Sequence, residues 1–442
     1  VIFTNKNKNK NKNNLPHSII PKLRIQNVKD FGAKGDGLTD DTTAIKNAIN
    51  AISVNDAKIK TLFIPEGTYL TKSILLRNIE NITIFGQNRN TTMIKLETIS
   101  NNSAHVINLM DIKNITIKGL TIDGSKDAIL QQIEDGTRKI ITKSDGTTRP
   151  MSGGHGIRTG GDFHIGLVLD DIIIQNCHSY AIGFQKGNNS NFYLNNFILR
   201  NAGADAMDFK NKFDGNGNIT ITNGFIKNFG TDHTQIGKAG IDIRGNATIS
   251  NINIELNNPT NRGIRIRRGG EQHGLGGEGV INNINILGAE DVIDKSYIGI
   301  AIEPRTPENY TFNNIYVKNA KLASILGIGG VFNNMVSENA PGEGALDIGW
   351  DCSNREPEDC NAGQNIMISN LQIKNPNESA IRMRETAKNV IINGFNISDI
   401  NNSKKSIKIY DQASNISLSN GFIPTVNSIE GNAIKNNILT SI

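Results

Sequence analysis

Apolar and polar residues alternate in short runs along most of the chain, and Gly, Asn and Asp separate the runs. Alternation with a period of two is typical of strands that bury one face. One segment differs, because Asp40-Asp41-Thr42-Thr43 precedes apolar residues at helical spacing, namely Ala44, Ile45, Ala48, Ile49 and Ile52. Asp and Thr are favoured at helix N-caps. The pattern therefore predicts one short helix near residue 42, followed by strands without further helices.

The strands recur at an interval. A small residue precedes the first apolar residue of nearly every repeat, and those first apolar residues are Ile157, Ile182, Met207, Ile241, Ile264, Ile300, Ile325, Leu346, Ile381 and Ile407. Consecutive ones lie 21 to 36 residues apart. A repeat of this length built from strands alone predicts an all-β parallel β-helix, in which each coil buries its apolar face against the next. The N-terminal helix would cap the open end of the stack, which otherwise exposes a strand edge.

A second periodic feature is an Asn that precedes an alternating apolar strand. It recurs as Asn196, Asn223, Asn251, Asn283, Asn314, Asn334, Asn370, Asn393 and Asn420. Asn tolerates the left-handed backbone conformation better than other residues with a side chain. The recurrence therefore predicts one tight bend, stacked coil upon coil.

The chain is predicted to form one domain. Residues 1–23 include an Asn/Lys run from Asn5 to Asn14 and are predicted to be a disordered lead. Residues 24–442 form the β-helix. The longer repeats place loop insertions near residues 128–153, 211–237 and 268–296.

The composition excludes several classes of protein. Of the 442 residues, 37% are hydrophobic and 20% are charged, which is enough to form a core and argues against wholesale disorder. No run approaches the ~20 consecutive apolar residues of a membrane-spanning helix, so membrane insertion is not expected. The net charge is only +5, and no basic block is interleaved with aromatic residues. Nucleic-acid binding is therefore not expected either.

The three cysteines form neither a disulfide framework nor a zinc-ligand set. Cys352 and Cys360 bracket a short polar loop, and the pattern leaves open whether they are bonded or free. A bond there would indicate an oxidising compartment. Cys177 lies in an apolar run and is expected to be a small core residue.

The beginning of the chain carries recognisable motifs. Residues 28–37 read Val-Lys-Asp-Phe-Gly-Ala-Lys-Gly-Asp-Gly, residues 39–42 read Thr-Asp-Asp-Thr, and residues 63–69 read Phe-Ile-Pro-Glu-Gly-Thr-Tyr. This opening resembles the pectate-lyase-like superfamily of right-handed parallel β-helices, which includes polygalacturonases, bacterial alginate C5-epimerases and phage tailspike depolymerases. The resemblance implies a right-handed helix, a polysaccharide substrate bound in a groove on its side, and a secreted or virion-associated protein. The tailspike relatives also imply a homotrimer as one form of assembly.

The catalytic motifs of these relatives are present only in part. Polygalacturonases carry an Asp pair, then Gly-His-Gly, then Arg-Ile-Lys. Here Gly154-His155-Gly156 precedes the acidic repeats, and Arg265-Ile266-Arg267 approximates the last element. Epimerases carry Tyr-Gly-Phe-Asp-Pro-His-Glu, whereas residues 182–187 lack both Asp and His; the later epimerase element survives at residues 203–207. The resemblance therefore leaves the reaction type open.

Side chains alternate across a strand, so the residues between the inward apolar ones face outward. Stacking the short strands predicts an outer column of Arg158, Gly183, Asp208, Asp242, Arg265, Ala301, Asp347, Arg382 and Lys408. The column two residues further on contains Gln185, Lys210, Arg244, Arg267, Glu303, Gly349, Arg384 and Tyr410. Because neighbouring coils are ~4.8 Å apart, the charged members are expected to form one patch over three coils, bordered by the insertions. Residues of such columns can also be ordinary solvated or paired charges.

Two chemistries fit this patch. In the first, Arg244, Arg265 or Arg267 neutralises a uronate carboxylate, and Lys210, Arg244 or His233 removes the adjacent proton, which leads to β-elimination or C5-epimerisation. In the second, two of Asp205, Asp208 and Asp242 hydrolyse a glycoside as an acid and base or an acid and nucleophile. A third hypothesis is a non-catalytic glycan-binding module or tailspike adhesin.

The favoured prediction is an extracellular enzyme of the lyase or C5-epimerase type acting on an anionic, uronate-containing glycan. The predicted catalytic residues are Asp205, Asp208, Lys210, Asp242 and Arg244. The predicted substrate-binding residues are His155, Arg158, Gln185, His233, Arg265, Arg267 and Glu303. No cofactor requirement is evident, although the carboxylates suggest Ca²⁺ as an option without any defined calcium loop.

Overall fold

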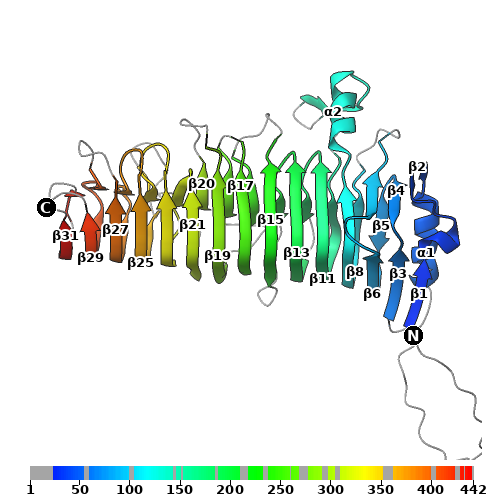
Figure 1. Ribbon diagram of the computed structural model, residues 1–442, viewed down its shortest axis with the longest axis horizontal. Helices are drawn as coiled ribbons and strands as arrows, with labels where there is room; N and C mark the ends of the chain where they lie inside the picture. The colour runs from blue at the N-terminus through cyan, green and yellow to red at the C-terminus, as the bar shows by residue number, and fades with distance from the viewer. Residues whose placement is uncertain are drawn as a thin grey trace, which may run out of the picture.

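The structure is a computed structural model of the chain (Figure 1). It describes residues 23–53, 59–98, 104–142, 146–150, 153–184, 188–209, 218–231, 237–258, 260–267, 277–290, 297–303, 309–351, 362–399, 405–423, 429–432 and 434–440. The strands stack side by side along one long axis from β1 at the N-terminal end to β31 at the C-terminal end. All pairings within this large sheet are parallel, so the predicted all-β parallel β-helix is confirmed.

Short strands form one face of the helix. They pair with the short strands of the coils before and after them, and β12 also pairs with the first residues of the long strand β11. Their bounds are β12 (Ile182–Phe184), β14 (Met207–Phe209), β16 (Ala239–Ile243), β18 (Arg262–Ile266), β20 (Ile298–Ile302), β22 (Lys321–Ile325), β24 (Leu346–Ile348), β26 (Ile381–Met383), β28 (Ile407–Ile409) and β30 (Ile429–Glu430). The first residues of β8 and β11 continue this face toward the N-terminal end.

Long strands form two further faces, because each bends within its length. Their bounds are β8 (Ile107–Asp123), β11 (Ile157–Cys177), β13 (Asn188–Ala202), β15 (Ile219–Phe229), β17 (Ala247–Leu256), β19 (Glu278–Gly288), β21 (Asn309–Lys318), β23 (Val331–Glu338), β25 (Gln364–Lys374), β27 (Lys388–Ser398), β29 (Ser414–Ile423) and β31 (Ile434–Thr440). Eight of the nine predicted bend asparagines have positive φ. The exception is Asn393, where the following residue, Gly394, has the positive φ instead. Glycine adopts the left-handed conformation without a steric cost, so the bend is preserved there.

The bend asparagines also bond to one another along the stack. Asn251 donates from Nδ2 to Asn223 Oδ1 at 3.0 Å, and Asn283 donates to Asn251 at 3.1 Å. Asn334 and Asn370 extend the series with bonds of 3.1 and 3.0 Å. At this exposed corner, each side-chain amide thus donates a hydrogen bond to the side-chain amide of the coil before it. Without these bonds the amides would have only water as a partner.

Inward-facing apolar residues form one continuous core. One column of it runs from Ile221 through Ile249, Ile281 and Phe312 to Phe332, and the last two rings are stacked at 4.6 Å. All five side chains are at most 1% exposed. The predicted core position of Cys177 is confirmed, because its side chain is fully buried.

The N-terminal end is closed as predicted. Helix α1 (Thr42–Ser53) buries Ile45, Ala48, Ile49 and Ile52 and lies over the first strand of the stack (Figure 1). The surrounding elements are β1 (Leu23–Asn27), η1 (Val28–Phe31), β2 (Asp36–Asp40), β3 (Ile59–Ile64), β4 (Gly67–Thr71), β5 (Ile74–Arg77), β6 (Glu80–Gly86) and β7 (Thr92–Leu96). Asp41 accepts hydrogen bonds from the backbone N–H groups of Lys34 and Gly35, at 2.7 and 3.0 Å. Part of the motif that resembles the superfamily thus holds the turn before the helix.

Several sequence-based expectations were wrong in detail. The 128–153 insertion is not purely loop: it overlaps helix α2 (Lys126–Glu134) and contains a hairpin of β9 (Ile140–Thr142) and β10 (Thr148–Pro150). Ala323, and not Ile325, is the partner of Ile300 and Leu346. The 211–237 and 268–296 ranges include β15 and β19, which are regular parts of the stack.

Other expectations fall outside the described residues. They include the disorder of most of the lead and the state of Cys352 and Cys360. Within the described part of the chain, neither helix is long and apolar enough to cross a membrane.

Candidate functional site

The outer column of the short strands has the predicted register. Gly183 pairs with Asp208, Asp208 with Asp242, and Asp242 with Arg265 on consecutive coils. The same column continues through Ala301 to the C-terminal coils. The alternation of small, apolar and polar residues is thus sufficient to predict the alignment of these side chains.

The carboxylates of this column are buried, although outward-facing residues were expected to be open to solvent. Asp208 is 1% exposed and Asp242 is 0% exposed. Arginines cover Asp242. Arg267 Nη2 lies 2.6 Å from Asp242 Oδ2, and Arg267 Nε donates to Oδ1 at 3.0 Å. Arg265 Nη1 lies 3.8 Å from Oδ2.

The neighbouring charges extend this arrangement in both directions. Arg244 Nη1 donates to Asp208 Oδ1 at 3.1 Å and to the carbonyl oxygen of Phe209 at 3.0 Å. Arg265 Nε donates to Glu303 Oε1 at 2.8 Å. We call Asp208, Asp242, Arg244, Arg265, Arg267 and Glu303 the charged cluster. Its cations lie outside its aspartates, because long guanidinium side chains reach over the shorter carboxylates of adjacent coils.

A second column of ionisable residues lies at the entrance to the same strands. Its members are His105, His155, Tyr180 and Asp205, and we call it the acid–base column. Each lies two residues before the inward apolar residue of its coil, and those apolar residues pair in register. The rings of His105 and His155 are 4.3 Å apart, and those of His155 and Tyr180 are 5.2 Å apart.

Sequence reasoning selected His155 and Asp205 but missed His105 and Tyr180. The constant spacing of two residues before Ile107, Ile157, Ile182 and Met207 was the signal that could have revealed all four. The acid–base column joins the charged cluster through a hydrogen bond between the side chains of Tyr180 and Asp208.

The environment shifts the proton affinities in this column. Burial, together with the carboxylates of Asp242 and Asp208, raises the pKa of Asp205 to about 6. This occurs although Lys238 Nζ lies 3.7 Å from Asp205 Oδ2 and Ala239 N donates to Oδ1 at 2.6 Å. Burial and the charges of Asp208 and Asp205 raise the pKa of Tyr180. The side chains can therefore hold protons at mildly acidic pH.

The pKa of His105, at the N-terminal end of the column, is shifted in the opposite direction. Burial and the nearby Arg158 lower the pKa of His105 to about 3, so this ring is neutral at physiological pH. Arg158 itself is half-buried, two coils before Asp208 in the outer column.

Replacing Asp205 with asparagine is expected to remove a pH-dependent part of the protein's stability. The folded-state pKa of about 6 exceeds the ordinary value of 3.8, so the folded protein holds an extra proton between these values. The stabilisation from that proton is complete at low pH and is lost as the pH rises through about 6. The difference corresponds to ~3 kcal/mol. Urea unfolding near pH 4.5 and near pH 8 measures the ~2 kcal/mol of it that is lost between these two pH values: the wild-type midpoint should decrease relative to D205N at the higher pH. A difference between the wild-type and D205N midpoints that is the same at both pH values would contradict the prediction.

Three of the predicted site residues, Lys210, Gln185 and His233, lie outside the described residues. The other predicted residues all lie in or beside the charged cluster and the acid–base column. Among the described residues, no three His, Cys, Asp or Glu side chains converge as metal ligands. The aspartates are neutralised by arginine and lysine, so this site does not fit the Ca²⁺ option.

Known proteins resemble the chain over part of its length. Residues 25–231 match the family model described as rhamnogalacturonase A/epimerase, pectate lyase-like. The chain is 30% identical over 138 residues to mannuronan C5-epimerase AlgE1 of Azotobacter vinelandii, a match covering 28% of this chain and 10% of that protein. It is 35% identical over 113 residues to alginate lyase 7 of the same bacterium, covering 23% and 13%. The chain thus spans only about a tenth of the length of these curated relatives.

Solved structures also resemble the chain over nearly its whole length. The catalytic unit of a thermostable GH87 alpha-1,3-glucanase from Streptomyces thermodiastaticus strain HF3-3 has a TM-score of 0.51 at 14% identity. The match covers 94% of this chain and 68% of the glucanase. At this identity the likeness concerns the fold alone.

Proposed function

Because the chain belongs to the pectate-lyase-like superfamily, we propose that its charged cluster and acid–base column form the active site of a carbohydrate-active enzyme outside the cell. The substrate is a uronate-containing polysaccharide, and the reaction is β-elimination or C5-epimerisation. Two of its relatives are named as an alginate lyase and a mannuronan C5-epimerase, which supports both reactions.

The observation that carries this proposal is the order of charges from solvent inward. The side chains of Arg265 and Arg267 are 19% and 27% exposed, whereas that of Asp242 is not exposed at all. Glu303 is 25% exposed, so a ligand meets two guanidinium groups and one carboxylate, which together carry a net positive charge. Guanidinium binds carboxylates in a planar, bidentate geometry, so the site favours an anionic sugar over a neutral one.

Proton transfer falls to the acid–base column. The Tyr180 oxygen takes the C5 proton of the uronate while its own proton passes to Asp208. Arg265 and Arg267 stabilise the negative charge that develops on the sugar carboxylate. In elimination the electron pair forms the C4–C5 double bond, the C4–O bond breaks, and Asp205 protonates the leaving oxygen. In epimerisation the C4–O bond stays intact, and Asp205 gives its proton to C5 on the opposite face of the ring.

The test uses a panel of polyuronates and neutral polysaccharides. Ultraviolet absorbance reports unsaturated uronates, reducing ends report chain cleavage, and proton NMR reports inverted C5 centres. New absorbance together with reducing ends, or inversion without cleavage, is expected on a polyuronate. Turnover confined to neutral polysaccharides would reject the assignment.

A hydrolase is the second candidate, and the pKa of about 6 at Asp205 favours it. A carboxyl group that remains protonated at mildly acidic pH can serve as the general acid of glycoside hydrolysis. The expected result would be reducing ends without new absorbance. The buried position of Asp208 and Asp242 beneath arginines makes this candidate the weaker one, since the second carboxylate must reach the sugar.

A further inference from the structure

A hollow surface runs along a different face of the helix, formed by the first halves of the long strands. It consists of three depressions of ≈ 560, ≈ 320 and ≈ 680 Å³. The first shares Asn218 with the second, and the second shares Asn246, Glu278 and Asn309 with the third. The depressions therefore form one trough from β8 to β25. Eight steps between coils make it roughly 38 Å long.

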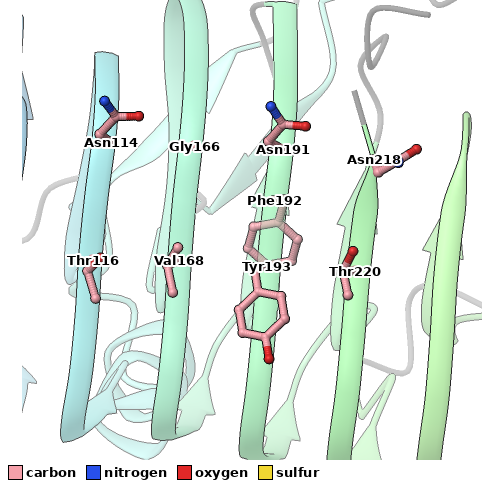
Figure 2. A pocket seen from close by; sticks show the side chains of 9 residues that line it. All are labelled: Asn114, Thr116, Gly166, Val168, Asn191, Phe192, Tyr193, Asn218 and Thr220. Carbon is pink, nitrogen blue, oxygen red and sulfur yellow. The ribbon is translucent and has the colours of Figure 1, made fainter. Parts of the chain in front are cut away.

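The floor of the trough is a single register column. Val168 pairs with Thr116 and Tyr193, and the column continues through Thr220 and Thr248. Val280 and Thr311 follow in register. Figure 2 shows Thr116, Val168, Tyr193 and Thr220 in a row across adjacent strands, with the ring of Tyr193 seen face-on. Tyr193 is 38% exposed, so an aromatic face is open to a ligand.

Amides line the upper edge of the trough. They belong to Asn114, Asn191, Asn218, Asn246, Asn309 and Asn365. In Figure 2, Asn114 and Asn191 stand on either side of Gly166, which leaves a notch between them. A Cβ at Gly166 would lie 2.8 Å from Asn114 Oδ1, so the notch depends on glycine. Within the described part of the chain, the side-chain amides of Asn191, Asn218 and Asn309 make no hydrogen bond.

The charge of the trough differs from that of the short-strand face. Glu278 is the single charged residue among the described residues that line the three depressions. A polyuronate would therefore find no cation there. Hydroxyl and amide groups act as both donors and acceptors, and sugar hydroxyls match them in the same two capacities.

We propose that this trough binds an extended strand of neutral polysaccharide. Successive sugar rings lie along the column of Thr hydroxyls, with one ring stacked on Tyr193 and the amide edge bonded to sugar hydroxyls. Protein interfaces of comparable length place aromatic residues and Met at their centres. This floor is mainly Thr and Val, and its one aromatic ring, Tyr193, and its one Met, Met367, lie toward opposite ends of the trough. A neutral glycan fits that chemistry better than a second copy of the chain. The site is independent of the charged cluster and of the reaction proposed for it.

The test measures calorimetric binding of neutral hexasaccharides, namely β-1,4-glucan, β-1,3-glucan, β-1,4-mannan and α-1,4-glucan, to the full chain. Saturable binding to at least one is expected. Y193A should weaken it about tenfold or more by removing the stacking surface, and T248E should abolish it by blocking the floor. The matched control is Y316A, since Tyr316 lies on the face formed by the second halves of the long strands, outside the trough. R267A should leave binding unchanged, whether or not the protein turns over a polyuronate.

Three results would overturn the proposal. The first is the absence of binding to every hexasaccharide. The second is binding that Y193A and T248E leave intact or that R267A removes, which would place the sugar at the charged cluster. The third is self-association in sedimentation experiments that T248E abolishes, with no glycan bound, which would identify the trough as an interface between copies such as a homotrimer.

Discussion

Replacing Tyr180 with phenylalanine is expected to lower kcat on a polyuronate by about 10²- to 10⁴-fold, the usual contribution of a general acid–base group. Phenylalanine keeps the ring beside His155 but removes the hydroxyl that bonds to Asp208. The KM should change little, because Arg265 and Arg267 continue to bind the uronate carboxylate. Steady-state kinetics at several pH values measure both constants.

Tyr316 provides the matched control for this variant. Its hydroxyl also bonds to a carboxylate, Glu338 Oε2 at 2.9 Å, but it lies on a different face of the helix. Y316F is expected to retain wild-type kcat. If Y180F also stays within about twofold of wild type, far below the usual acid–base contribution, Tyr180 does not transfer the proton. The same kinetics on D205N would then show whether Asp205 does.

Replacing Asp242 with alanine is expected to give the largest loss of stability, ~3–5 kcal/mol, because removal of one partner leaves buried charge uncompensated. Three guanidinium groups lie within 3.8 Å of this carboxylate, and their own side chains are 8–27% exposed. Without Asp242, Arg244, Arg265 and Arg267 would repel one another across adjacent coils. Urea unfolding followed by circular dichroism measures the shift in midpoint.

Glu290 is the control for the stability experiment. Its Oε1 lies 3.9 Å from Lys318 Nζ, but its side chain is 83% exposed. An ion pair so open to water contributes ~0–1 kcal/mol, so E290A should unfold close to the wild-type midpoint. Equal midpoints for D242A and E290A would mean that the arginines reach water once Asp242 is gone, and that the carboxylate is not needed for folding.

Local sequence patterns predicted much of the charged cluster because strand geometry is strict. With a side-chain period of two, the position of one inward isoleucine determines where its neighbours point. Asp208, Asp242 and Arg265 could thus be aligned from Met207, Ile241 and Ile264 alone. The rule is weaker where two inward candidates compete, as at Ala323 and Ile325. Alanine satisfies the inward position there with a small side chain that a search for large apolar residues overlooks.

The amino-acid sequence by itself determined the parallel stack, its bends and the face that carries the charges. These features repeat from coil to coil, and each depends on contacts within one or two coils. Only the tertiary structure decided that Asp242 lies beneath arginines, that Tyr180 joins His155 to Asp208, and that a neutral trough runs along another face. The physical reason is that these features form where long side chains from separate coils meet. Their burial and pairing depend on where long, flexible groups come to rest, and a one-dimensional pattern does not specify that.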